Sequence, residues 1–204
     1  MPFNPSIPAM GNVIAEDVPD IEENFACLGY TNIWVPAGSM IPLDTDGAAS
    51  GLKEYATNDI MLDYFAFNGA AEEYVAFNLA MPENWNRSTI KAKFFWAPGD
   101  SACSAGDKVE WEIGGGALTD DDAIDAAIGT TQVIYDTVLV GKDADMHVSA
   151  VTPAITIGGT PALLDLIHVK VSRNVSSAND TMAEDAWLFG VMLQIKVNEA
   201  FIAW

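Results

Sequence analysis

The residues that could carry out chemistry are few, and their spacing fits no familiar catalytic arrangement. Nucleophilic catalysis needs a nucleophile, a base and an orienting group held together. The chain has two histidines, His147 and His168, and each lies in an apolar run where a structural or surface role is the simpler interpretation. The stretch 102–106 resembles a nucleophile elbow only superficially, because it lacks the first glycine and falls between two expected strands. The sequence therefore predicts no catalytic residue.

Metal-ligand patterns are equally weak. Cys27 and Cys103 lie far apart in the chain, with no CxxC spacing and no neighbouring histidine. Asp44 and Asp46 precede Gly47 as at the start of a calcium loop, but the later ligands of an EF-hand are missing. An aspartate-rich turn is therefore the better interpretation, and we predict no metal and no cofactor.

Two further stretches invite a functional interpretation. The glycines at 114–116 are followed by neither the lysine of a phosphate loop nor a dinucleotide-binding spacing. The acidic trio 120–122 follows Thr119, which suits the first turn of a helix, so one or two helical turns are expected at 123–128, with a strand as the alternative. Carboxylate pairs for glycoside hydrolysis stay open, because their separation in space is not visible in a sequence.

Charge excludes several classes of partner. With 29 acidic and 9 basic residues the formal net charge is −20, which repels nucleic acid and anionic lipid. No run is long enough for a membrane-spanning helix, and the first residues do not form a signal peptide, so we expect synthesis in a cytoplasm without secretion by this route. Hydrophobic residues make up 50% of the chain, and we expect other subunits to cover part of this apolar excess.

The elements that must position these residues are predicted to be antiparallel strands with one buried face. Apolar residues alternate with small or polar ones at 74–81, 89–96 and 108–113, the period of a half-buried strand. Similar runs occur at 32–36, 60–67, 132–140, 146–151, 154–157, 167–171 and 187–197. Roughly eight to ten strands with turns between them are typical of a sandwich or jelly roll. The predicted fold is an antiparallel β-sandwich of jelly-roll type over residues 25–204.

The strand pattern also predicts a hairpin with two ion pairs. The runs 89–96 and 108–113 are expected to pair, and Phe94 and Val109 must share the buried face. The charged residues then lie together on the other face, so the predicted pairs are Lys93 with Glu110 and Lys91 with Glu112. The turn at 68–69, Asn-Gly, is expected to join 60–67 to 74–81 in a second hairpin.

The loop before the last strand contains a further candidate pair. Arg173 is predicted to be held by a carboxylate, with Asp180 the first candidate, because the planar guanidinium can form a two-pronged pair. An unpartnered surface arginine is the alternative. In the last strand, the period of two assigns Trp187 and Phe189 to the same face as Val191.

Residues 1–24 are predicted to form an extended arm. Four prolines and an acidic patch at 16–23 favour extended chain over packed elements. The arm also contains apolar residues that a solvated tail would not need, so we expect it to dock on another protein chain, with a solvated tail as the alternative. These anchors are Phe3, Ile7, Met10, Val13 and Ile14.

A resemblance to a known group of proteins rests on short motifs in a fixed order. They are WVPAG at 34–38, AF at 66–67, MPENW at 81–85, FW at 95–96, VEW at 109–111, DMHV at 145–148, VSR at 171–173, NDTMA at 179–183 and DA at 185–186. In this order the chain resembles small virion structural proteins of tailed bacteriophages over residues 32–197. The resemblance implies a β-sandwich presented on the particle surface, with no catalytic pattern to carry over.

The expectation is therefore a non-enzymatic virion protein that binds and covers. A capsid decoration or cement protein, assembled as a homotrimer on the major capsid protein, is the first hypothesis, since the arm could reach across a neighbour. A fibre component that recognises a host surface glycan is the alternative. A carbohydrate-active enzyme on a jelly-roll scaffold is a remote third, because fold does not imply function.

Overall fold

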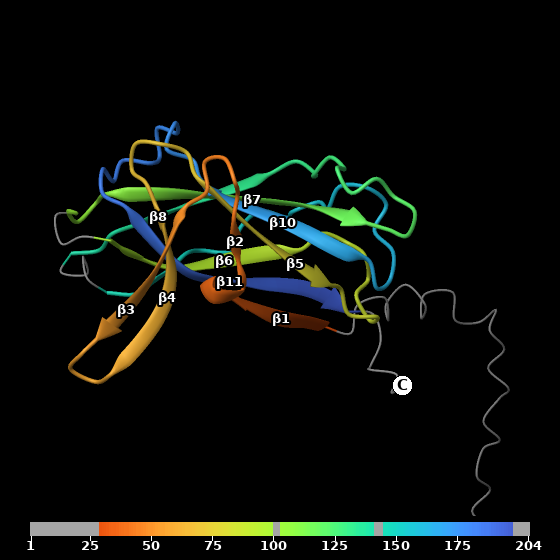
Figure 1. The fold of residues 1–204 in the computed structure, drawn as a ribbon, viewed down its shortest axis with the longest axis horizontal. Helices are drawn as coiled ribbons and strands as arrows, with labels where there is room; N and C mark the ends of the chain where they lie inside the picture. The colour runs from red at the N-terminus through yellow and green to blue at the C-terminus, as the bar shows by residue number, and fades with distance from the viewer. Residues whose placement is uncertain (1–28, 100–102, 141–144, 198–204) are drawn as a thin grey trace, which may run out of the picture.

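The structure is a computed structural model, and it describes residues 29–99, 103–140 and 145–197. The predicted arm, residues 1–24, lies outside the described residues. Two antiparallel sheets stack face to face (Figure 1). The elements are β1 (Gly29–Pro36), η2 (Ala37–Ser39), β2 (Ile41–Pro42), β3 (Ala49–Tyr55), β4 (Ile60–Phe67), β5 (Tyr74–Ala80), β6 (Lys91–Pro98), β7 (Lys108–Leu118), β8 (Gln132–Thr137), β9 (His147–Val148), β10 (Leu166–Arg173) and β11 (Ala186–Val197).

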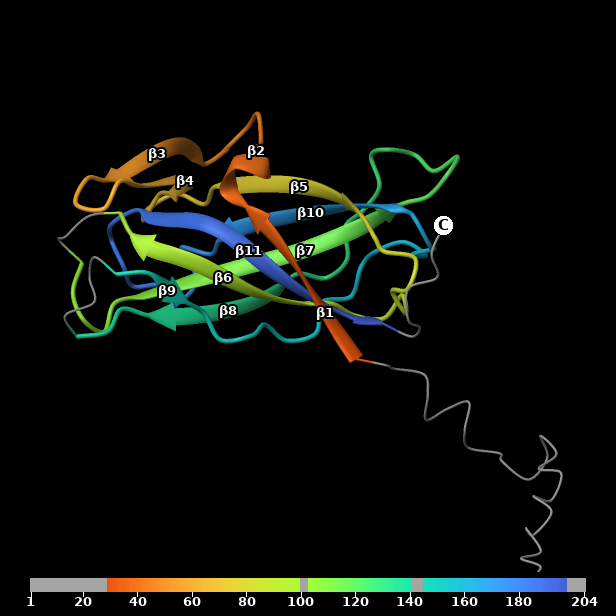
Figure 2. The same ribbon diagram turned by 90° about the horizontal axis from the view of Figure 1, so that it is seen from below.

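The two sheets are wound as a jelly roll. Sheet A has the order β3-β4-β11-β6-β9, with β1 also paired to β11, and sheet B has the order β2-β5-β10-β7-β8. From β4 to β7 and again from β8 to β11, each strand lies in the opposite sheet from the one before it. Figure 2 views the molecule from the side of sheet A, with β1 nearest the viewer. The predicted antiparallel β-sandwich of jelly-roll type is confirmed.

Alternation within the strands builds the core between the sheets. Val75 and Phe77 on β5 are buried, and so are Ala92, Phe94 and Trp96 on β6, as the period of two predicts. The centre is an aromatic cluster in which the ring of Trp111 lies 5.2 Å from that of Phe67, 5.4 Å from that of Phe94 and 6.2 Å from that of Trp96. Burying such large rings is the dominant favourable term in a sandwich of this size.

The predicted hairpin between 89–96 and 108–113 is wrong. β6 pairs with β11 and β9 in sheet A, whereas β7 pairs with β10 and β8 in sheet B. Phe94 and Val109 do share the core, but they reach it from opposite sheets. The alternation of side chains shows only which face of a strand is buried. Two strands can share a buried face either as hydrogen-bonded neighbours in one sheet or as strands that face each other across the sandwich.

Two local predictions are also corrected. β4 and β5 belong to different sheets, so the Asn68-Gly69 turn starts a crossover instead of a hairpin; Asn68 Oδ1 accepts hydrogen bonds from the backbone N–H groups of Ala70 and Ala71. Residues 123–128 contain no helix. The Asp122 carboxylate accepts a hydrogen bond from Thr119 N–H, which closes a single turn, and the chain then returns to β7. An aspartate at this position caps a turn as readily as it caps a helix.

The glycine run of β7 has a packing role. Gly115 O accepts hydrogen bonds from the N–H groups of both Gly129 and Gly158, so three backbone segments meet there. Within the run, a Cβ at Gly115 would lie 2.9 Å from His168 O, and on the segment that faces it a Cβ at Gly158 would lie 2.5 Å from Gly129 N. Only glycine permits this approach, which explains the run without a phosphate.

A bulge in β11 reverses the face assignment of its first residues. The register with β6 shifts between Leu188 and Gly190, so Phe189 is the extra residue. Leu188 and Val191 both pack in the core, while Phe189 is buried outside that cluster. The prediction that Trp187 and Phe189 share the face of Val191 is therefore wrong, and both aromatic rings belong to the outer face of sheet A.

Candidate functional site

The histidines take structural positions. His147 is buried, and its ring stacks on Trp96 at 4.9 Å between centroids. His168 Nδ1 lies 2.9 Å from Asn78 Oδ1 on the outer face of sheet B. Among the described residues, no group of three or more acidic, histidine or cysteine side chains is placed to hold a metal ion. Within the same ranges, no helix is both long and apolar enough to cross a bilayer.

The predicted Arg173–Asp180 pair is confirmed. Arg173 Nε donates to Asp180 Oδ2 at 2.9 Å, and Nη2 donates to Asp180 Oδ1 at 2.7 Å. Both side chains are almost wholly buried, with exposed fractions of 0% and 2%. The guanidinium also donates to the backbone carbonyls of Phe67, Met182 and Glu184. Arg173 therefore ties β10 of sheet B to the end of β4 in sheet A and to the segment that leads into β11.

The other predicted ion pairs do not form, because their partners lie in different sheets. Lys93 is opposite Met192 and Lys91 is opposite Gln194 in the register of sheet A, whereas Glu110 is opposite Tyr135 and Glu112 is opposite Val133 in sheet B. Glu110 is buried and accepts hydrogen bonds from the side-chain amides of Asn174 and Asn179. Lys91 and Lys93 therefore lie on the outer face of sheet A, in a different sheet from the glutamates with which they were predicted to pair.

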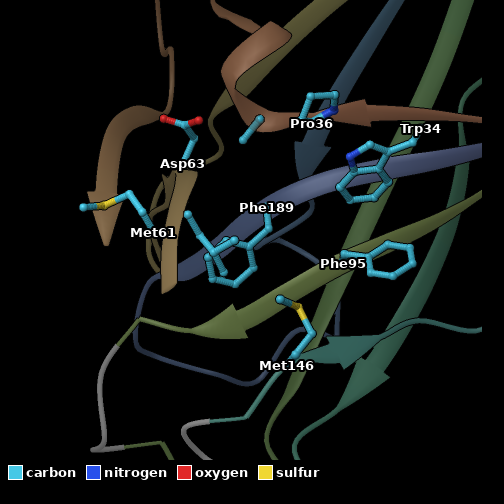
Figure 3. Close-up of a pocket in the computed structure, with 9 residues that line it drawn as sticks. Trp34, Pro36, Met61, Asp63, Phe95, Met146 and Phe189 are labelled. Atoms are coloured by element: carbon cyan, nitrogen blue, oxygen red, sulfur yellow. The ribbon is translucent and has the colours of Figure 1, made fainter. Parts of the chain in front are cut away.

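That outer face contains an apolar pocket of about 350 Å³. Figure 3 shows side chains from β1, β4, β6 and β11, with Met146, gathered around it. The pocket lies where sheet A divides, because β1 pairs with β11 from residue 190 onward and β4 pairs with β11 only over 186–188. The lining residues are Trp34, Pro36, Ala37, Met61, Leu62, Asp63, Phe95, Met146 and Phe189. Asp63 is the one acidic residue among them.

Aromatic contacts hold the wall of the pocket in place. Trp34 meets Phe95 edge to face at 4.9 Å, and a Cβ on Gly190 would lie 2.4 Å from the Trp34 ring, so that ring covers the glycine closely. Behind the lining residue Phe189, the ring of Tyr64 lies 6.4 Å from that of Phe189 and stacks on Trp187 at 4.3 Å. Trp34 is 48% exposed, and Met61 and Met146 are exposed to a similar extent. The face therefore offers apolar surface that is preorganised and open to solvent.

Beyond the pocket, the outer face of sheet A carries three lysines. Lys91 and Lys93 precede Phe95 on β6, with their side chains opposite the core residues Ala92 and Phe94, and Lys196 lies at the far end of β11. The strands β1, β6 and β11 contain no aspartate or glutamate, although the chain has 29 acidic residues. We call this surface the docking face and define it by Trp34, Phe95, Phe189, Met61 and Met146 with Lys91, Lys93 and Lys196.

Sequence reasoning missed the docking face for identifiable reasons. It placed Trp187 and Phe189 inside, and it assigned Lys91 and Lys93 to glutamate partners. One signal was present, namely Gly190 within an otherwise apolar strand, because an isolated glycine in a strand often marks a bulge or a close approach. The predicted arm residues Phe3, Ile7, Met10, Val13 and Ile14 lie outside the described residues.

Comparisons with known proteins give only distant similarities. The sequence matches no family model and no curated protein. Among solved structures, a family 35 carbohydrate-binding module from Cellvibrio japonicus has 9% identity and a TM-score of 0.43, covering 80% of this chain and 92% of that one. A module described for mannan recognition has 10% identity and a TM-score of 0.41, covering 82% and 98%.

Larger proteins also appear among the solved structures. A xylanase fragment from Clostridium thermocellum, with a carbohydrate-binding module and a catalytic module, has 11% identity and a TM-score of 0.44, covering 82% of this chain and 28% of that one. The chain spans 23% of an arabinofuranosidase and 18% of a glucanotransferase that it also matches. At TM-scores below 0.5, these similarities identify no family for this chain.

Proposed function

We propose that the protein is a non-enzymatic structural protein of a bacteriophage particle, an oligomer, in the simplest case a homotrimer, that decorates or cements the capsid surface. The resemblance in the sequence, from residue 32 to residue 197, supports the virion assignment. The observation that carries a binding role is the docking face, which joins exposed apolar side chains to three lysines.

The docking face has the chemistry of a protein contact. Aromatic residues and methionine are enriched in interfaces, whereas aspartate, glutamate and also lysine are depleted there, so lysines in a contact call for an acidic partner. The described part of the chain matches this pattern locally, since β1, β6 and β11 lack acidic residues in a protein of net charge −20. Elsewhere, like charge opposes the approach of another copy. A contact between copies, or with another acidic protein, is therefore favoured at this face.

The position of the protein on the intact particle tests the proposal. Electron cryomicroscopy of the phage should show the sandwich in many symmetry-related copies on the outer surface of the shell. Purified particles stripped of the protein should bind it back and gain resistance to heat or to loss of divalent cations. Density confined to the tail, or absence from the particle, would overturn the decoration assignment.

A fibre component that recognises a host glycan is the second candidate, and the pocket favours it. A half-exposed indole such as Trp34 can stack on a sugar ring, and the Asp63 carboxylate could accept hydrogen bonds from sugar hydroxyls. Binding to host surface polysaccharide, lost on Trp34→Ala and kept on Tyr135→Ala, would support this candidate. Tyr135 is a suitable control because it is exposed to the same degree on β8 of sheet B.

A further inference from the structure

We propose that the docking face binds the N-terminal arm of a second copy of this chain, with the acidic segment 16–23 on the lysines and the apolar segment 10–14 in the pocket. This inference rests on the proposed function, in which copies assemble through the arm, and it names the contact that would join them. Residues 1–28 lie outside the described structure, so the argument uses their sequence and the surface on which they would lie.

Charge complementarity identifies the first part of the contact. Residues 1–28 contain five acidic side chains, all within 16–23, and no basic side chain. The docking face offers Lys91, Lys93 and Lys196, which are three of the nine basic residues in the chain, and its three central strands contain no acidic residue. An acidic segment would gain favourable pairs at this face, whereas the acidic remainder of the chain would repel it.

The order of residues along the arm matches the order along the face. On β6, Lys91 and Lys93 come before Phe95 and the pocket; on β11, Lys196 lies at the end where Gly29 begins β1, opposite Val197. In the arm, the acidic segment lies nearer to Gly29 and the apolar residues Met10, Val13 and Ile14 lie farther out. An arm that runs from the lysines toward the pocket therefore places the acidic segment 16–23 beside the lysines and the apolar segment 10–14 beside the pocket.

The arm is long enough for this contact. From Lys91 to Phe95 the strand advances about 13 Å, and the arm from residue 20 to residue 14 spans about 20 Å when extended. From Gly29 back to Ile14 the extended chain reaches about 50 Å, which is enough to cross to a neighbouring molecule. Prolines hold such a segment extended and reduce the entropy lost when it docks.

The arm on each docking face comes from a second copy of the chain. β1 runs along sheet A from Gly29 toward the pocket, so the chain before Gly29 would have to reverse its direction to reach the pocket of its own molecule. Copies that exchange arms bury the apolar pocket of each molecule. Such an arrangement closes into a ring when the rotation between copies is regular, which suits the proposed trimer.

Two complementary variants test the proposal. The first lacks residues 1–24 and keeps the face; the second keeps the arm and carries Lys91→Glu with Lys93→Glu. We expect wild type to self-associate in sedimentation velocity and each variant alone to associate at least about tenfold more weakly, since close charge pairs across an interface couple strongly. Mixed in equal amounts, the two variants should form a one-to-one heterodimer through the single intact arm and face.

Controls separate the contact from unfolding and from net charge. Lys108→Glu with Lys170→Glu makes the same charge change on the outer face of sheet B and should leave association unchanged. Met61→Ser with Met146→Ser alters two half-exposed pocket residues, so it should weaken association without lowering thermal stability. Added salt should weaken association, because it screens the lysine contacts.

The outcomes that overturn the proposal are distinct from those that overturn the proposed function. A monomeric wild type, or variants that form no heterodimer when mixed, would rule out exchange of arms. A monomeric wild type is the result expected if each arm folds onto its own sandwich. An arm-deleted variant with wild-type stoichiometry would show that copies meet elsewhere. Neither result would change the position of the protein on the particle, which is measured independently.

Discussion

Replacing Asp180 by asparagine should destabilise the fold severely, because it leaves a buried guanidinium without its counter-charge. Asp180 Oδ2 accepts from Arg173 Nε and from Glu110 N–H, each at 2.9 Å, and Oδ1 accepts from Arg173 Nη2 at 2.7 Å. An asparagine amide puts an NH₂ group where one of these oxygens stood, so at least one donor then faces another donor. Breaking a buried pair of this kind costs about 3 to 5 kcal/mol of unfolding free energy.

A double-mutant cycle would measure the contribution of the pair. Arg173→Met, Asp180→Asn and the double variant should show a coupling energy of about 1 to 3 kcal/mol, because the two side chains share their hydrogen bonds. The assay is urea unfolding at one fixed protein concentration, since self-association adds to the apparent stability. Arg173→Lys should not rescue, because an ammonium cannot reproduce the two-pronged contact together with three carbonyls.

Asp185→Asn is the matched control, because Asp185 is exposed in the same segment before β11. Its effect should stay within about 0.5 kcal/mol. If Asp180→Asn cost less than about 1 kcal/mol, the pair would behave as a surface ion pair, and the view that it ties the two sheets together would be refuted.

Three further predictions concern the core, the bulge and one titrating group. Gly190→Ala should cost about 1 to 3 kcal/mol and displace Trp34, since the new Cβ would lie 2.4 Å from that ring; thermal unfolding and a crystal structure would check it. Trp111→Ala should cost about 3 to 5 kcal/mol in urea unfolding, because the ring is fully buried among three aromatic neighbours. Burial, followed by a hydrogen bond and charge repulsion from Glu72, raises the pKa of Tyr74 above its ordinary value of 10.0. The native state therefore holds the Tyr74 proton more tightly than the unfolded state does. The protonated hydroxyl contributes to the free energy of unfolding in full below pH 10.0, and this contribution is lost as the pH rises through the native pKa. Tyr74→Phe should remove that part of the alkaline loss of stability.

The faces of the strands could be predicted from sequence, whereas their partners could not. Alternation is a local property, and it correctly placed Ala92, Phe94 and Trp96 in the core. Which strand lies beside β6 depends on how the chain crosses between sheets, and the short connections gave no signal that distinguishes a hairpin from a crossover. The two lysine–glutamate pairs were wrong for this reason.

The Arg173–Asp180 pair could be predicted because it is local. The two residues are seven positions apart, and an arginine before a polar loop needs a nearby acceptor. What the sequence did not show is the burial of the pair and its three carbonyl contacts, which come from β4 and from the segment before β11. The importance of the pair for stability follows from those distant contacts.

The docking face and the largest errors in face assignment have one cause, the bulge in β11. One extra residue turns Phe189 outward while Leu188 and Val191 stay in the core, and Gly190 then leaves room for the Trp34 ring. The same bulge lies where β4 ends its pairing with β11 and β1 begins, so the gap in the sheet and the aromatic wall arise together. Phe189 itself stays buried on the outer face, but the neighbouring Trp34, Met61 and Met146 remain about half exposed, which does not stabilise an isolated sandwich. Local rules are broken in native proteins chiefly where function requires it, and here the break produces an apolar pocket beside three lysines in a strongly acidic protein.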